Sequence, residues 1–153
     1  MPVQKLKRFL DDNDVKYVTI GHSQAFTAQE VAASAHLPGK ELAKTVMVKL
    51  DGTMAMAVVP APAQVDLEAV REAAGAGEAE LATEDEFEEL FPYCEAGAMP
   101  PFGNLWDMDV YADSALRDDE KIAFEAGSHT ELVQLSYADF ERLVEPTVAD
   151  LTA

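Results

Sequence analysis

The sequence contains a single cysteine, Cys94, and has no apolar run of the ~20 residues that a membrane-spanning helix requires. One cysteine excludes an internal disulfide framework and a cysteine zinc cluster. Residues 1–10 mix basic and apolar side chains at helical spacing, so they lack the continuous apolar region of a signal peptide. These absences predict a soluble, cytoplasmic protein that has no membrane partner.

Positive charge is scarce as well, with 11 Lys and Arg against 29 Asp and Glu and a net charge of −18. The deficit is uneven: residues 1–50 carry seven basic against five acidic residues, and residues 51–153 carry four against 24. Because phosphate contacts dominate nucleic-acid binding, the acidic body argues against general nucleic-acid affinity and against DNA as a partner. The basic N-terminal third leaves room for one local contact with a polyanion. The bulk acidity is typical of a protein kept soluble by charge, or adapted to high salt.

Hydrophobic periodicity and turn signals predict a mixture of helices and strands. Strands are expected at 15–20, 42–50, 53–59, 105–111, 122–126 and 132–135, and helices at 3–11, 28–35, 66–74, 83–92 and after Ser136. Asp51-Gly52 is a hairpin signal, so at least one strand pair is antiparallel. The chain length suits one domain, residues 1–153. The expected fold class is therefore α/β of the α+β type, a single domain with a mixed β-sheet and packed helices.

The loop Gly97-Ala98-Met99-Pro100-Pro101-Phe102-Gly103 carries no charge. Its glycines allow unusual backbone angles and close approach, whereas the double proline is stiff and cannot join a central strand. Flexible ends around a rigid apolar middle predict a loop held in one shape. Two interpretations stay open: a tight turn that packs Phe102 onto the core, or a loop that carries function.

Lys44 lies in the middle of an apolar row. Alternation along the predicted strand places it on one face with Leu42, Val46, Val48 and Leu50. An isolated ammonium group there is costly unless it is paired. Either the side chain reaches a carboxylate at the sheet edge, or it is a fixed cation that lines a pocket for a phosphate, carbonyl or carboxylate.

His129 ends the small-residue turn Ala126-Gly127-Ser128-His129, where a pocket could reach the ring or the ring could be structural. The three histidines show no metal-ligand spacing, so no metal site is expected. Cys94 has no basic neighbour and is expected to be an ordinary buried cysteine. Neither a phosphate-binding glycine loop nor a Ser/His/Asp signature is present, and no cofactor is predicted.

Several stretches in this order resemble the YbaK/prolyl-tRNA-synthetase-associated editing domain family, the free-standing aminoacyl-tRNA deacylases. They are 27–32, 43–46, 82–86 continuing to 90–92, the 97–103 loop and 126–129. The resemblance covers roughly residues 15–146. It implies a curved mixed sheet and hydrolysis of the ester between a wrong, small amino acid and the 3′ end of a tRNA.

The resemblance also implies roles for single residues. Lys44 stands at the place of the central functional lysine, and Gly97 and Pro101 match a Gly-x-x-x-Pro loop whose backbone holds the substrate carbonyl. The remaining substrate-binding candidates are Thr45, Ala98, Met99, Pro100, Phe102, Gly103, Gly127, Ser128 and His129. Preorganised N–H groups would stabilise the charge that develops on the carbonyl oxygen. Without a nucleophilic triad, water would attack directly, assisted by a ribose hydroxyl.

The expected partner is the 3′ acceptor end of an aminoacyl-tRNA, with an aminoacyl-tRNA synthetase or elongation factor as a further candidate. Thr45 departs from some relatives that edit alanine, which carry asparagine after the lysine, so alanine is not favoured as the amino acid. Two alternatives stay open: a non-catalytic ligand-binding or regulatory module of the same fold, and a general hydrolase of small amino-acid esters.

Overall fold

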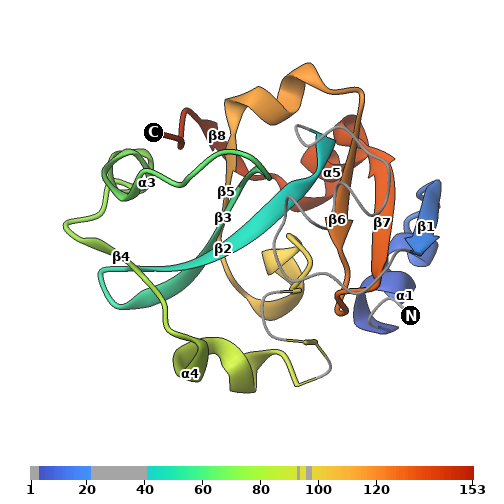
Figure 1. Cartoon of the computed structure of the whole chain (residues 1–153), viewed down its shortest axis with the longest axis horizontal. Helices are drawn as coiled ribbons and strands as arrows, with labels where there is room; N and C mark the ends of the chain where they lie inside the picture. The colour runs from blue at the N-terminus through green and yellow to red at the C-terminus, as the bar shows by residue number, and fades with distance from the viewer. Residues whose placement is uncertain (1–3, 22–40, 93, 96–97) are drawn as a thin grey trace.

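The computed structural model describes residues 4–21, 41–92, 94–95 and 98–153. Two β-sheets lie against each other with helices packed around them (Figure 1). The helix expected at 28–35, the candidate residue Gly97, and His22 and His36 lie outside the described residues. The expected fold class, mixed α/β, is confirmed.

The larger sheet has five strands in the order β4-β2-β3-β5-β8. Its centre is the antiparallel hairpin of β2 (Ala43–Leu50) and β3 (Thr53–Pro60). Asp51 and Gly52 form the turn with positive φ angles of 51° and 83°, as their sequence predicts. The other strands are β4 (Ala79–Leu81), β5 (Val110–Asp113) and β8 (Thr147–Ala149), and the β3–β5 and β5–β8 pairs are parallel.

The smaller sheet is antiparallel, in the order β1-β7-β6. Its strands are β1 (Tyr17–Gly21), β6 (Lys121–Glu125) and β7 (Glu131–Ser136). One isolated parallel bridge, Leu42 to Ala123, joins the two sheets at the start of β2. The expected mixed sheet is therefore hydrogen-bonded as two sheets that meet at this bridge.

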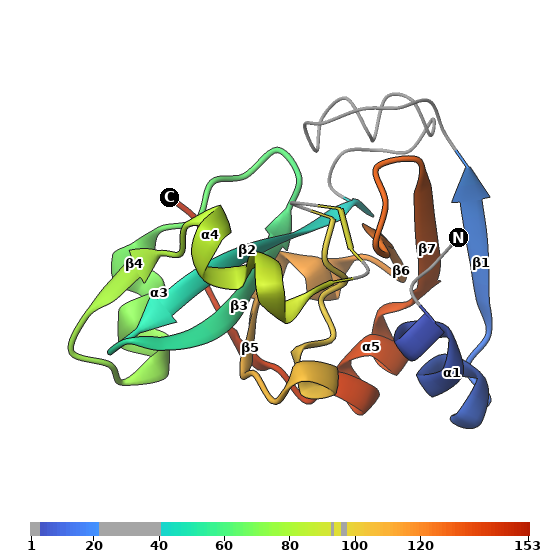
Figure 2. The same ribbon diagram turned by 90° about the horizontal axis from the view of Figure 1, so that it is seen from below.

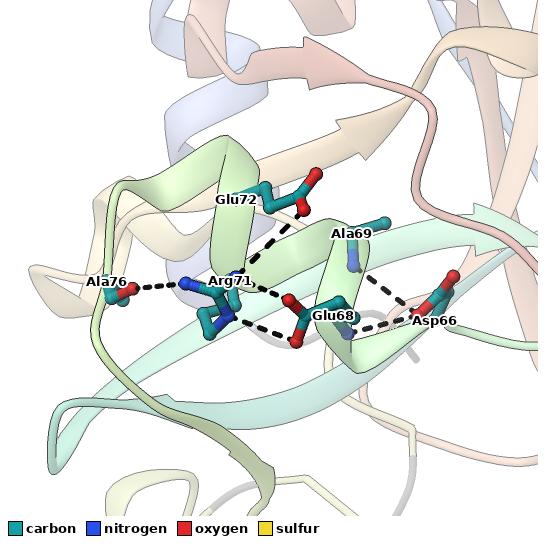
Figure 3. Close-up of polar contacts among 6 residues, drawn as sticks. All are labelled: Asp66, Glu68, Ala69, Arg71, Glu72 and Ala76. Atoms are coloured by element: carbon teal, nitrogen blue, oxygen red, sulfur yellow. Dashed lines mark hydrogen bonds and ion pairs between the residues drawn. The ribbon is translucent and has the colours of Figure 1, made fainter.

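Among the described residues, the helices with eight or more residues are α1 (Gln4–Asp12), α3 (Leu67–Ala74) and α5 (Tyr137–Val144). The Asp66 carboxylate caps α3 by accepting a hydrogen bond from the Glu68 N–H at 3.0 Å (Figure 3). Gly75 ends the helix at φ 66°. Within the described part of the chain, no helix is both long and apolar enough to cross a membrane.

The main core lies around Phe102, which is fully buried. Its ring contacts those of Phe9, Phe124 and Phe140 at centroid distances of 6.1, 5.4 and 5.7 Å. These rings come from α1, β6 and α5, so one loop residue ties the helices to the smaller sheet. A second, smaller core lies between α3 and the larger sheet.

The strand expected at 105–111 is wrong in its first half. Gly103–Trp106 forms a 3₁₀ helix, and β5 begins only at Val110. Asp107 adopts a left-handed conformation (φ 56°), which ends the 3₁₀ helix and interrupts extended backbone. The helix expected at 83–92 divides into α4 (Glu84–Phe87) and a 3₁₀ turn, Glu88–Leu90. The sequence analysis missed β4 and β8, which have three residues each and too little periodicity to detect.

Candidate functional site

The proline loop and the Gly-Ser-His turn are joined by backbone hydrogen bonds. The Gly127 N–H donates to the Ala98 carbonyl at 2.8 Å, and the Gly127 carbonyl accepts from the Glu95 N–H at 2.8 Å. Gly127 has a φ of 112°, which L side chains rarely adopt, so a glycine is required at this crossing. Two segments that are distant in sequence are therefore held together as one unit.

His129 is buried within this unit, with 7% of its surface exposed. Its backbone N–H donates to the Glu95 carboxylate at 2.8 Å. Its Nδ1 lies 2.7 Å from Oε2 of Glu125, the last residue of β6. Burial raises the pKa of Glu125 to about 7, although the neighbouring imidazole opposes this shift. The turn thus brings a buried carboxyl and an imidazole into direct contact.

Lys44 is half-buried on β2, opposite Val59 of β3. Burial lowers the pKa of its ammonium group, because desolvation disfavours the charged form. Among the described residues, no carboxylate lies within ion-pair distance of Lys44. Lys49, on the same strand, forms ion pairs with both Glu80 and Glu86. Within the described residues, the expected alternative of a sheet-edge ion pair thus applies to Lys49 and is not seen at Lys44.

The bridge between the sheets relates Lys44 to the turn. Leu42, the residue before β2, pairs with Ala123 of β6 in parallel orientation. Lys44 and Glu125 each follow two residues later, so the two strands carry them in the same direction from the bridge. Lys44, Glu125 and the His129 turn therefore lie toward the same end of the two sheets.

The side chains of the proline loop are anchored in the protein. Met99 and Phe102 belong to the main core, and Pro100 and Pro101 are buried. A Cβ on Gly103 would lie 2.7 Å from Cγ2 of Val110 and 2.8 Å from the Met108 carbonyl oxygen, so close packing requires glycine. The interpretation in which Phe102 packs onto the core is thus observed. Because Phe102 is fully buried and Met99 nearly so, their side chains anchor the loop to the core.

The remaining candidates are half-buried. Thr45 follows Lys44 and belongs to the opposite face of β2, where it pairs with Val58. Ser128 Oγ lies 3.3 Å from Thr130 Oγ1, a contact within the turn.

Burial raises the pKa of the Cys94 thiol to about 11, which keeps the thiol protonated and disfavours a nucleophilic role. No metal-binding group of His, Cys, Asp or Glu exists in the described ranges.

Sequence reasoning missed Glu95 and Glu125. Glu125 stands four residues before His129, at the end of a predicted strand, and Glu95 precedes the proline loop by two residues. The sequence signal that could have indicated them was a carboxylate next to the proline loop and another next to the Gly127–His129 turn. That signal was weak, because exposed carboxylates are abundant in so acidic a chain.

The chain is similar to two kinds of curated protein. It is 29% identical over 153 residues to the multifunctional Ser/Thr-tRNA deacylase ProXp-y of Escherichia coli K12, and this match covers 96% of the chain and 90% of the deacylase. It is 30% identical over 88 residues to the proline–tRNA ligase of Bacillus cereus Q1. That match covers 58% of the chain but only 15% of the ligase, which is a much longer protein.

The fold is shared with solved structures. A candidate trans-editing enzyme for prolyl tRNA synthetase superposes with a TM-score of 0.83 at 21% identity, covering 98% of this chain and 96% of that one. At this level of identity the likeness establishes the fold alone. The model of the aminoacyl-tRNA editing domain matches residues 22–143, and the chain therefore belongs to the aminoacyl-tRNA editing domain family.

Proposed function

We propose that this protein is a free-standing aminoacyl-tRNA deacylase, which hydrolyses the ester between a small, wrongly attached amino acid and the 3′ end of a tRNA. One observation carries the proposal: the chain aligns over 96% of its length with a relative named as a Ser/Thr-tRNA deacylase. Serine and threonine are accordingly the first amino acids to test. This tRNA substrate is made and used in the cytoplasm, which is the proposed location.

Lys44 supplies the positive charge in this proposal. A half-buried ammonium group without a carboxylate partner among the described residues is available to an incoming anion. The partly desolvated position strengthens its attraction to a phosphate or to the developing oxyanion. An arginine would carry the same charge on a longer, planar group that does not match the position of the lysine amine.

The proline loop and the Gly127–His129 turn hold the reacting ester. The Ala98 N–H already donates to the Glu95 carbonyl, and Pro100 and Pro101 have no N–H. The Met99 N–H forms no backbone hydrogen bond among the described residues, so it is the proposed donor to the ester carbonyl. Water attacks the carbonyl carbon, the ester C–O bond breaks, and the released tRNA 3′ oxygen takes a proton.

A deacylation panel tests this function. We expect faster-than-background hydrolysis of seryl- and threonyl-tRNA, and a fall in kcat/KM of about 100-fold or more in Lys44→Met, which keeps the bulk of the side chain without its charge. Lys49→Met is the matched control on the same strand, and it should retain activity. If no charged tRNA in a panel of alanyl, seryl, threonyl and cysteinyl substrates is cleaved, the proposal fails.

The same panel separates the alternatives. A non-catalytic module would bind the charged tRNA without turnover, and a general esterase would cleave small amino-acid esters as readily as the tRNA. The short match to a proline–tRNA ligase supports a synthetase as a candidate partner. Addition of prolyl-tRNA synthetase to the assay tests that partner directly.

A further inference from the structure

Half of the ten lysines and arginines in the described part of the chain already have a partner. Lys49, Arg71, Arg117 and Arg142 form ion pairs with Asp or Glu, and the Lys5 ammonium lies 5.3 Å from the centre of the Trp106 ring. Lys44 belongs to the candidate site. Of the described cations, this leaves four without a carboxylate in ion-pair distance: Lys7, Arg8, Lys16 and Lys121.

Two of these four share a groove. Lys121 pairs with Ser136 across β6 and β7, and Lys16 lies beside Ser136 because the next residue, Tyr17, pairs with Leu135. The two exposed lysines therefore flank Ser136 in one row across three strands, about 10 Å apart. They line a groove of about 450 Å³ together with Val18, Gln134, Ser136 and Asp139.

The groove and the candidate site lie on one sheet. Side chains alternate along β6, so Lys121, Ala123 and Glu125 share a face. Glu125 contacts His129, and its backbone lies about 13 Å along the strand from Lys121. About four nucleotides of a stacked strand span this length. The single-stranded 3′ end of a tRNA has the same reach. Figure 2 shows β6, β7 and β1 side by side.

We propose that the groove between Lys16 and Lys121 binds the phosphate backbone of the tRNA acceptor arm, with the 3′ end reaching the His129 turn at the other end of β6. The inference rests on the proposed function for its choice of polyanion. In a chain of net charge −18, a pair of unpartnered lysines is a rare local attraction for phosphate. Asp139 of α5 is the carboxylate that opposes binding in the groove.

Binding of uncharged tRNA tests the groove without any need for turnover. We expect Lys16→Gln/Lys121→Gln to weaken binding roughly ten- to fiftyfold at about 0.1 M salt, and each lysine to account for about one unit of the salt slope. Lys7→Gln is the matched control, because Lys7 is equally exposed and unpartnered but outside the groove. Asp139→Asn should tighten binding, a gain that misfolding cannot produce.

Deacylation kinetics give the second readout. The double variant should raise KM for charged tRNA at an unchanged kcat, and it should cleave a 3′-aminoacyl adenosine as well as the unaltered protein does. Three results would overturn the proposed tRNA-binding role of the groove. They are tRNA binding by the double variant that equals that of the unaltered protein, a loss of binding in Lys7→Gln that equals that of the double variant, and no tRNA binding by the unaltered protein. If the unaltered protein binds tRNA but cleaves no ester, and the double variant loses this binding, the tRNA-binding role of the groove is supported and the deacylase function is rejected.

Discussion

Nδ1 of His129 lies 2.7 Å from Oε2 of Glu125, with 9% and 15% of the two side chains exposed. The contact joins the end of β6 to the turn that follows it. A carboxyl in so little water is more stable when protonated, and for this reason the pKa of Glu125 rises to about 7. The pair places a group that titrates near neutral pH beside the proline loop.

The raised pKa of Glu125 predicts a pH-dependent stability. The carboxyl binds its proton more tightly in the folded protein than in the unfolded chain, where its pKa is about 4.3. Its contribution is therefore fully present below about pH 4.3 and is lost as pH rises through about 7. In urea unfolding, the stability of the unaltered protein relative to Glu125→Gln should fall across this window and level off above it.

The neighbouring charges define the control for that experiment. Glu95 and His129 both face Glu125, and both remain in the Gln variant. Glu78→Gln, which removes an exposed carboxylate next to β4 in the larger sheet, is the comparison variant. A pH-independent difference between Glu125→Gln and the unaltered protein would contradict the prediction.

The Glu95 carboxylate should stabilise the Gly127–His129 turn through the His129 N–H. Glu95→Ala removes the acceptor, and we expect a loss of about 1 kcal/mol in the free energy of unfolding together with reduced deacylation. Glu95→Gln keeps an acceptor oxygen and should restore most of both. If Gln behaves like Ala, the negative charge of Glu95 matters and the acceptor alone is insufficient.

Gly103→Ala should destabilise the protein by about 1–3 kcal/mol, because the added Cβ meets Val110 and the Met108 backbone at under 3 Å. Gly21→Ala is the matched control, since a Cβ there meets no atom within 4 Å. Thermal or urea unfolding of both variants measures the effect. Equal stabilities would show that the 3₁₀ helix at Gly103 shifts freely.

Asp66→Ala should lower the free energy of unfolding by about 1 kcal/mol, because the Glu68 N–H at the start of α3 loses its acceptor. Asp66→Asn retains a capping oxygen and should lose much less. The exposed Arg71–Glu68 ion pair on the same helix should contribute little, so Arg71→Gln is the comparison (Figure 3). If Asp66→Asn is as unstable as Asp66→Ala, the charge of Asp66 stabilises the helix and its hydrogen bond does not.

The sequence by itself determined the features that depend on neighbouring residues. The Asp51-Gly52 turn follows from local backbone preferences, and the structure confirms it. The Asp66 cap and the Gly75 stop of α3 are features of the same local kind. Alternation placed Lys44 in an apolar row for the same reason, since strand geometry is local. The full set of candidate site residues came from the resemblance of several ordered motifs to the editing-domain family.

Only the tertiary structure decided which segments meet. Glu95 reaches His129 because two segments that are distant in sequence cross at Gly127, a contact that no spacing in the chain encodes. The 3₁₀ helix that stands in place of the first half of the expected strand packs its Gly103 against Val110 and Met108, which are later in the chain. The pairing of Lys16 with Lys121 across Ser136 likewise depends on strand register between residues more than 100 positions apart. The whole fold sets burial and long-range strand register, and these decide which residues of a sequence pattern lie together in a site.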